Sequence, residues 1–302
     1  MLTRCSNLKE LVLVRVTFNT EACTIAGRRP CLETFKHCDS SVALSNLLDA
    51  EPGSLESPID FSTLRVLEIT ITEETRNIQH DYNVFLAACD SVEKVAFING
   101  TPGSSPIEPY FSFHGATSLR QLETYAEFEP SSPAHLSTVC KLLAGIERLE
   151  SLKLTIYLAE LPDCLYQYPP EPRDLLSAPW DIFFLELKRL LRPDKRFSLT
   201  FSVRYTILQY TNFWWEWEPE WSSIMEKDHV RPWYCELCLS NDEMIERRVT
   251  HSKLFCRDIL KEIVGKYFEP KHFDLVDIDF EVWVTVRFHA WDSSTRHFPH
   301  VP

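Results

Sequence analysis

The stretch Phe61-Ser-Thr-Leu-Arg-Val-Leu-Glu-Ile-Thr-Ile71 places apolar residues in the spacing L-x-x-L-x-L, at Leu64, Leu67 and Ile69. We expect these three side chains to point inward from a short strand, whose other residues face the opposite way. One such strand cannot bury its inward side chains alone. Parallel stacking of several copies makes a continuous core, so the stretch predicts a repeat protein in which each strand depends on its neighbours.

The same spacing occurs in six copies whose first positions lie 24 to 32 residues apart. Leucine-rich repeats have a period of roughly 20 to 29 residues, which loop insertions lengthen. Polar residues stand at the sixth position of two copies, His37 and Thr124, which makes these copies the weakest. The copies are Leu8, Leu11 and Leu13; Leu32, Phe35 and His37; Leu64, Leu67 and Ile69; Val92, Val95 and Phe97; Leu119, Leu122 and Thr124; and Leu149, Leu152 and Leu154.

The segments between and after the copies predict helices and further strands. Apolar residues at helical spacing predict outer helices over residues 40–49, 82–90, 134–149 and 180–191, and one or two helices over 244–268. Alternating apolar residues predict strands over 197–205 and 275–288. We therefore expect an α/β leucine-rich-repeat solenoid, shaped like a horseshoe with parallel strands on its concave face and helices outside. Residues 1–205 form this solenoid, and residues 206–302 form an aromatic and acidic insertion and an irregular helix-strand cap.

Composition narrows the class of partner. The 302 residues are 44% hydrophobic and 25% charged, as in ordinary globular proteins, and the formal net charge is −13. Nucleic-acid binding calls for a basic surface, and an anionic membrane surface repels an acidic protein. No apolar run reaches the roughly 20 residues of a membrane span, and the first residues lack a signal-peptide core. We expect an intracellular protein, cytoplasmic or nuclear, with a basic or neutral protein partner; the oligomeric state is not predicted.

The copies Cys5-Ser-Asn-Leu-Lys-Glu-Leu-Val-Leu13 and Phe61 to Ile71, with their alternating helices, resemble the leucine-rich-repeat region of fungal F-box proteins. The resemblance covers roughly residues 1–205. In that family the F-box docks the protein to a cullin ubiquitin ligase, and the repeats select the substrate to be ubiquitylated. The first 60 residues here contain no Leu-Pro-led F-box helix. The resemblance therefore implies a protein-recognition surface similar to that of a ligase adaptor, without a visible F-box.

The third, fifth and seventh positions of each copy are expected to face solvent on the concave side. Their mixture of charged, apolar and aromatic residues suits a protein-binding surface. The alternative is a solvated sheet face whose partner site lies elsewhere. The predicted partner-binding residues of this face are Val66, Glu68, Thr70, Lys94, Gln121, Glu123, Tyr125 and Lys153. Carboxylates also alternate at Asp277, Asp279 and Glu281, where they could attract a basic partner or simply face water.

A tryptophan cluster at residues 214, 215, 217 and 221 is a second candidate for partner binding, represented by Trp214 and Trp217. Tryptophan is enriched at the energetic centres of interfaces. The alternative is local packing onto the end of the solenoid, because large apolar groups seldom stay exposed.

A zinc-binding C-terminal module is the alternative hypothesis. Cys235, Cys238, His251 and Cys256 follow the spacing C-x2-C-x12-H-x4-C, which is typical of zinc fingers. Strand alternation would place Cys235 and Cys238 on opposite sides, so buried thiols are the competing interpretation. We assign no metal ligand and no cofactor.

No catalytic motif accompanies these features. The sequence contains no G-x-G-x-x-G, no Walker A loop, no G-x-S-x-G and no H-E-x-x-H. A hydrolase would rest only on the presence of ten histidines, none of them in a nucleophile or metal motif. We therefore expect a non-catalytic protein with no catalytic residues.

Overall fold

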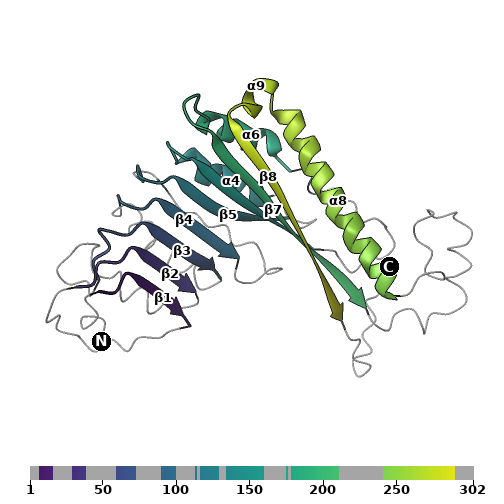
Figure 1. Ribbon diagram of the computed structural model, residues 1–302, viewed down its shortest axis with the longest axis horizontal. Helices are drawn as coiled ribbons and strands as arrows, with labels where there is room; N and C mark the ends of the chain where they lie inside the picture. The colour runs from purple at the N-terminus through teal and green to yellow at the C-terminus, as the bar shows by residue number, and fades with distance from the viewer. Residues whose placement is uncertain are drawn as a thin grey trace, which may run out of the picture.

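A computed structural model describes residues 7–15, 29–38, 59–72, 90–99, 113, 116–128, 134–159, 175, 178–210 and 241–289. They form one eight-stranded sheet whose strands follow the order of the chain, β1 to β8, with every neighbouring pair parallel. The predictions of an α/β protein and of parallel stacking are confirmed. Figure 1 shows the strands side by side from the N-terminal to the C-terminal end of the sheet.

The strands lengthen along the chain, from five residues in β1 to fourteen in β7 and β8. Figure 1 shows β7 and β8 extending well beyond the shorter strands. The strands span Glu10–Val14 (β1), Thr34–Cys38 (β2), Val66–Ile71 (β3), Lys94–Asn99 (β4), Gln121–Phe128 (β5), Ser151–Ala159 (β6), Phe197–Tyr210 (β7) and Val276–His289 (β8).

The register aligns the predicted copies with one another. The fourth positions pair in a single row across the sheet, and Leu199 and Ile278 continue that row in β7 and β8. His37 and Thr124 occupy the same inward positions as leucines of neighbouring strands and are themselves buried. A polar residue at the sixth position therefore does not interrupt the stacking. The fourth-position row is Leu11, Phe35, Leu67, Val95, Leu122, Leu152, Leu199 and Ile278.

The helices pack against the inward face of the sheet. Helix α4 (Ala134–Ala144) contacts β5 and α6 (Trp180–Leu190), while α8 (Asn241–Tyr267) contacts α6 and β8. In Figure 1, α4 and α6 lie behind the sheet and α8 runs alongside β8. The short helix α9 (Pro270–Phe273) leads into β8. Inward side chains of the strands and apolar side chains of these helices form one buried cluster.

Trp180 anchors α6 at the centre of this cluster. Its side chain is 1% exposed and its ring lies 6.1 Å from the rings of both Phe128 and Phe201, which point inward from β5 and β7. Its indole Nε1–H donates to the Leu175 carbonyl at 2.6 Å, so the buried polar atom is satisfied. The aromatic contacts fix the helix over the strands.

The amino ends of the strands carry a repeated hydrogen-bond pattern and a ladder of charges. The carbonyls of Lys9, Glu33, Arg65, Glu93 and Arg120 each accept two backbone N–H groups from the next strand segment, at 2.7 to 3.0 Å. The side chains at these five positions and at Glu150, the next in the series, alternate between positive and negative charge. Ion pairs join Lys9 to Glu33, Arg65 to Glu93 (2.8 Å) and Arg120 to Glu150 (3.6 Å). Alternation avoids stacking like charges one strand spacing apart.

Several predicted elements differ from the observed ones at their ends. Helix α4 ends at Ala144, before Gly145, instead of continuing to residue 149, and the predicted helix or helices over 244–268 form one helix that begins at Asn241. The strand predicted over 275–288 is β8, which extends the sheet by parallel pairing with β7. The helices expected over 40–49 and 82–90 fall, apart from Asp90, outside the described residues.

Candidate functional site: the open face of the sheet

One face of the sheet is left uncovered by the helices that the structure describes; we call it the open face. Parallel sheets are usually covered on both faces, so an uncovered face is informative. The side chains of β3 alternate between half-buried and fully buried, with Val66, Glu68 and Thr70 on the open face and Leu67 and Ile69 on the covered one. The division between core and surface positions therefore follows the sequence spacing.

The eight residues predicted to face a partner on the sheet lie together on the open face. Val66, Lys94 and Gln121 are register partners in one row. Glu68, Glu123 and Lys153 belong to the next row, in which Ala96 stands between the two glutamates. Thr70 and Tyr125 lie two residues further along β3 and β5. All are half-buried except Gln121, which is exposed. Trp214 and Trp217 lie outside the described residues.

Lysines and glutamates of the open face pair across strands. Lys36 lies 3.1 Å from Glu10, and Lys94 lies 2.5 Å from Glu123. Each pair is partly exposed and stabilises the fold only modestly. Glu68 and Asp279 make no ion pair within the described part of the chain. Glu68 is nevertheless the register partner of Lys36, whose pKa is raised mainly by Glu10 and further by Glu68.

A longer ion pair crosses a whole strand. Lys153 Nζ on β6 lies 2.8 Å from Glu281 Oε2 on β8, above the small side chains of Thr200 and Ser202 on β7. The hydrogen bond from Lys153 holds the pKa of Glu281 below its ordinary value of 4.5, with weaker support from Ser202 and Trp283 against the opposing effect of burial. The pair ties the last three strands together on their open face.

Aromatic and arginine side chains gather on the open face of β5 to β8, in the carboxyl halves of β5 and β6 and midway along β7 and β8. Tyr157, Arg204 and Trp283 are register partners on three adjacent strands, and the ring of Tyr125 lies 6.0 Å from that of Tyr157 in an edge-to-face arrangement. We call these four residues the aromatic patch. Trp283 is 62% exposed, although large aromatic side chains are usually buried. Tyrosine, tryptophan and arginine are the residues enriched at the energetic centres of interfaces.

Three members of the aromatic patch were missed by reasoning from the sequence. Tyr157, Arg204 and Trp283 occupy the ninth position of their copies, two residues beyond the last position that we considered. The short strands β1 to β4 end before that position, whereas β6 to β8 continue past it. The signal was present in the sequence, because Trp283 continues the alternation of Asp277, Asp279 and Glu281.

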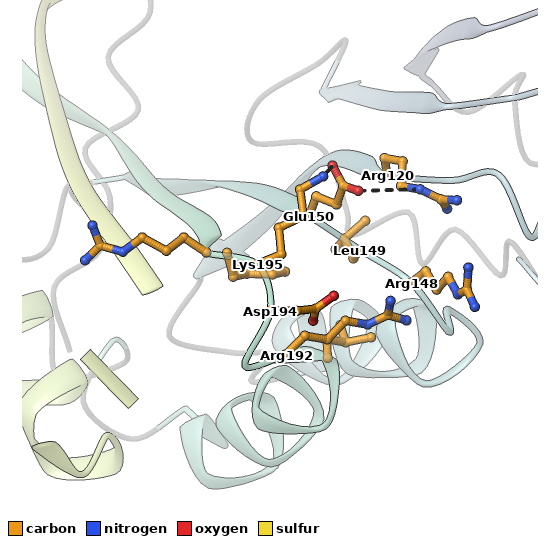
Figure 2. Close-up of a pocket in the computed structure, with 10 residues that line it drawn as sticks. Arg120, Arg148, Leu149, Glu150, Arg192, Asp194 and Lys195 are labelled. Carbon is orange, nitrogen blue, oxygen red and sulfur yellow. Dashed lines mark ion pairs between the residues drawn. The ribbon is translucent and has the colours of Figure 1, made fainter. Parts of the chain in front are cut away.

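A second feature is a pocket of about 200 Å³ at the amino ends of β5, β6 and β7. Figure 2 shows the guanidinium groups of Arg120, Arg148 and Arg192 on one side of it, with Asp194 nearby and Lys195 directed at Glu150. Lys195 Nζ lies 2.6 Å from Glu150 Oε2. No sequence pattern groups these residues, because they come from three loops that only the folded sheet brings together.

The zinc hypothesis concerns four residues of which the structure describes two. His251 and Cys256 lie on α8, and Cys256 is 2% exposed within the apolar core, where burial raises its pKa to about 12. The His251 ring stacks 6.0 Å from that of Phe255. Among the described residues, no three His, Cys, Asp or Glu side chains gather as a metal site. Cys235 and Cys238 lie outside the described residues, so the zinc module stays a hypothesis.

Comparisons with known proteins do not place this chain in a family. No family model, no curated protein and no solved structure matches it. In the described part of the chain, no helix is both long and apolar enough to cross a membrane.

Proposed function

We propose that this chain is a non-catalytic recognition module that binds a protein partner on the open face of its sheet. The observation that carries the proposal is the aromatic patch, in which Trp283 stays 62% exposed on a parallel sheet face that no described helix covers. Leaving a large aromatic side chain in water forgoes the free energy of burying it, about 1.5–3 kcal/mol for a large apolar side chain. A partner that covers the open face would recover that free energy.

The repeat geometry supports a solenoid of the leucine-rich-repeat type, and the horseshoe form is part of the proposal. Six sequence copies lie in one register, and strands β1 to β8 stack in chain order. Repeat arrays of this kind bind partners over extended sheet surfaces rather than in one deep cleft. In the fungal F-box family that the copies resemble, such a surface selects a ubiquitin-ligase substrate, and we extend that role to this chain.

The chemistry of the open face indicates the kind of partner. Its lysines form ion pairs with Glu10, Glu123 and Glu281, whereas Glu68 and Asp279 form none within the described part of the chain. The aromatic patch offers an apolar anchor beside these carboxylates. We propose a partner segment that combines Lys or Arg side chains with an exposed apolar or aromatic residue, because opposite charges steer association and apolar contacts provide affinity.

Quantitative affinity capture from a native extract tests the proposal. We compare the wild-type chain with Trp283→Ala and with Leu185→Ala, which removes an equally exposed apolar side chain (65%) from α6 on the helical side. Loss of a residue at an interface centre costs about 2 kcal/mol or more. Trp283→Ala should therefore reduce capture of the specific partner at least tenfold, and Leu185→Ala should leave it unchanged.

The same experiment separates the recognition surface from the ligase role. Cullin-ligase subunits among the captured proteins would support the extension from the F-box family; a specific partner without them would remove the ligase role and keep the recognition surface. Identical capture by the wild type and Trp283→Ala would contradict the open face as the binding surface.

A further inference from the structure

The pocket at the amino ends of β5, β6 and β7 carries a local surplus of positive charge. Along the first six strand segments the charge ladder is neutral, because each cation is followed by a carboxylate. At the pocket this balance fails. Among the described residues, five cationic side chains line it, against the two carboxylates of Glu150 and Asp194. The five cations are Arg120, Arg148, Arg192, Lys195 and Arg196.

The ion pairs at the pocket leave two arginines without a carboxylate. Glu150 is shared by Arg120 and Lys195, at 3.6 and 2.6 Å, and Arg196 turns to Asp277 on β8, at 3.0 Å. Within the described part of the chain, Arg148 and Arg192 form no ion pair. Arg192 is half-buried and Arg148 is exposed.

Support of the helix ends does not account for these two arginines. Helix C-termini attract cations because their last carbonyls are unsatisfied. Beyond the end of α4 that role belongs to Arg189, whose guanidinium donates to the carbonyls of Leu143 and Ile146 at 2.7 and 3.0 Å. At the end of α6, the backbone N–H of Leu191 donates to the Lys188 carbonyl. Arg148 and Arg192 are therefore available to a ligand.

We propose that this pocket binds a phosphate monoester through Arg148 and Arg192, with Arg120 at its rim. A guanidinium group offers paired N–H donors that match two oxygens of one phosphate, and two such groups balance the charge of a phosphate dianion. A volume of about 200 Å³ accommodates a phosphate group together with water. With a net charge of −13 the chain as a whole repels anions, so phosphate binding requires a local surplus of this kind.

This site does not rest on the proposed function, since it lies at the amino ends of β5 to β7, whereas the aromatic patch lies on the open face, midway along β7 and β8. Two sources share its chemistry: a phosphorylated side chain of another protein, and a free small phosphate.

Isothermal titration calorimetry at constant ionic strength tests the site with four probes. The probes are inorganic phosphate, sulfate, a short peptide with one phosphoserine, and the same peptide without phosphate. We expect saturable one-to-one binding of the phosphate-bearing probes and none of the unphosphorylated peptide. Arg148→Ala and Arg192→Ala should each weaken binding roughly tenfold, because each removes a charge-assisted contact.

Two further variants exclude effects of misfolding. Asp194→Asn removes a carboxylate from the pocket and should tighten phosphate binding at least twofold, a gain that loss of structure cannot produce. Arg65→Ala removes an exposed arginine from the same edge of the sheet, where it pairs with Glu93, and should leave binding unchanged.

The outcomes either identify the source of the bound phosphate group or overturn the proposal. Phosphopeptide binding at least tenfold tighter than that of inorganic phosphate would identify a phosphorylated protein segment, and equal affinities would identify a free phosphate. Either result supports the site if Arg148→Ala and Arg192→Ala weaken binding of the phosphate-bearing probes. The proposal is overturned if no phosphate-bearing probe binds, or if the unphosphorylated peptide binds as tightly as its phosphorylated form. It is also overturned if Arg192→Ala binds both sulfate and phosphate as tightly as the wild type does.

Discussion

Lys153 spans two strand spacings, roughly 9.5 Å, to reach Glu281. This is possible because β7 presents only Thr200 and Ser202 beneath the lysine side chain, and Ser202 is buried. A larger residue at either position would separate the charged groups. The composition of one strand therefore decides a contact between its two neighbours.

The stabilisation from this pair should depend on pH in a defined direction. The pKa of Glu281 is lowered in the folded chain, so the pair stabilises the fold above the ordinary glutamate pKa of 4.5. This stabilisation is lost as the pH falls through the lowered pKa. At pH 7, Glu281→Gln should reduce the free energy of unfolding by less than about 1 kcal/mol, because the pair is partly exposed. The difference from the wild type should vanish in acid.

Urea unfolding of the wild type, Glu281→Gln, Lys153→Gln and the double variant at several pH values measures this contribution. The double variant should be no less stable than Glu281→Gln alone, because one interaction is removed in both. A difference between wild type and Glu281→Gln that stays constant from pH 7 into acid would contradict the assignment.

At the scale of elements, α6 packs on the sheet through its buried side chains, of which Trp180 is the largest. The ring contacts Phe128, Phe183 and Phe201, and its Nε1–H is bonded to the Leu175 carbonyl. Trp180→Ala should lower the free energy of unfolding by about 3–5 kcal/mol, since it leaves a cavity in the core and an unpaired buried carbonyl. Leu185→Ala, on the exposed side of α6, should change it by no more than about 0.5 kcal/mol.

Chemical denaturation compares the two variants. It is followed by far-UV circular dichroism, which reports the backbone and does not depend on tryptophan fluorescence. Equal and small effects of Trp180→Ala and Leu185→Ala would mean that α6 does not depend on this anchor.

The elements also show which features a sequence can predict. The spacing at Leu64, Leu67 and Ile69 predicted the buried side of β3 and, through its copies, the register of six strands, because burial with period two is a local property. The alternation of Asp277, Asp279 and Glu281 also predicts one face of a strand, and all three lie on the same face of β8. The pairing of Glu281 with Lys153 could not be predicted, because the two residues are 128 positions apart and meet only when β7 lies between them.

At the scale of the whole molecule, the amino ends of the strands differ in chemistry from the open face of the sheet. The amino ends of the strands carry alternating charges that terminate in the arginine-lined pocket, whereas the open face of β5 to β8 carries the aromatic patch. The pocket escaped sequence analysis because Arg120, Arg148 and Arg192 belong to three separate loops. The charge at the second position of each copy alternates in the sequence from Lys9 to Glu150. This alternation stops after Glu150, where the surplus of positive charge at the pocket begins.

Site-specific photo-crosslinking tests the central claim, that the open face is the recognition surface. A photoreactive phenylalanine analogue replaces Thr155 or Thr285, which flank the aromatic patch on β6 and β8, and, as controls, Ile182 or Leu185, which are exposed on α6. After irradiation in native extract, the same partner should be crosslinked from both open-face positions and from neither helical position. Crosslinking of that partner from α6, with none from Thr155 or Thr285, would contradict the claim.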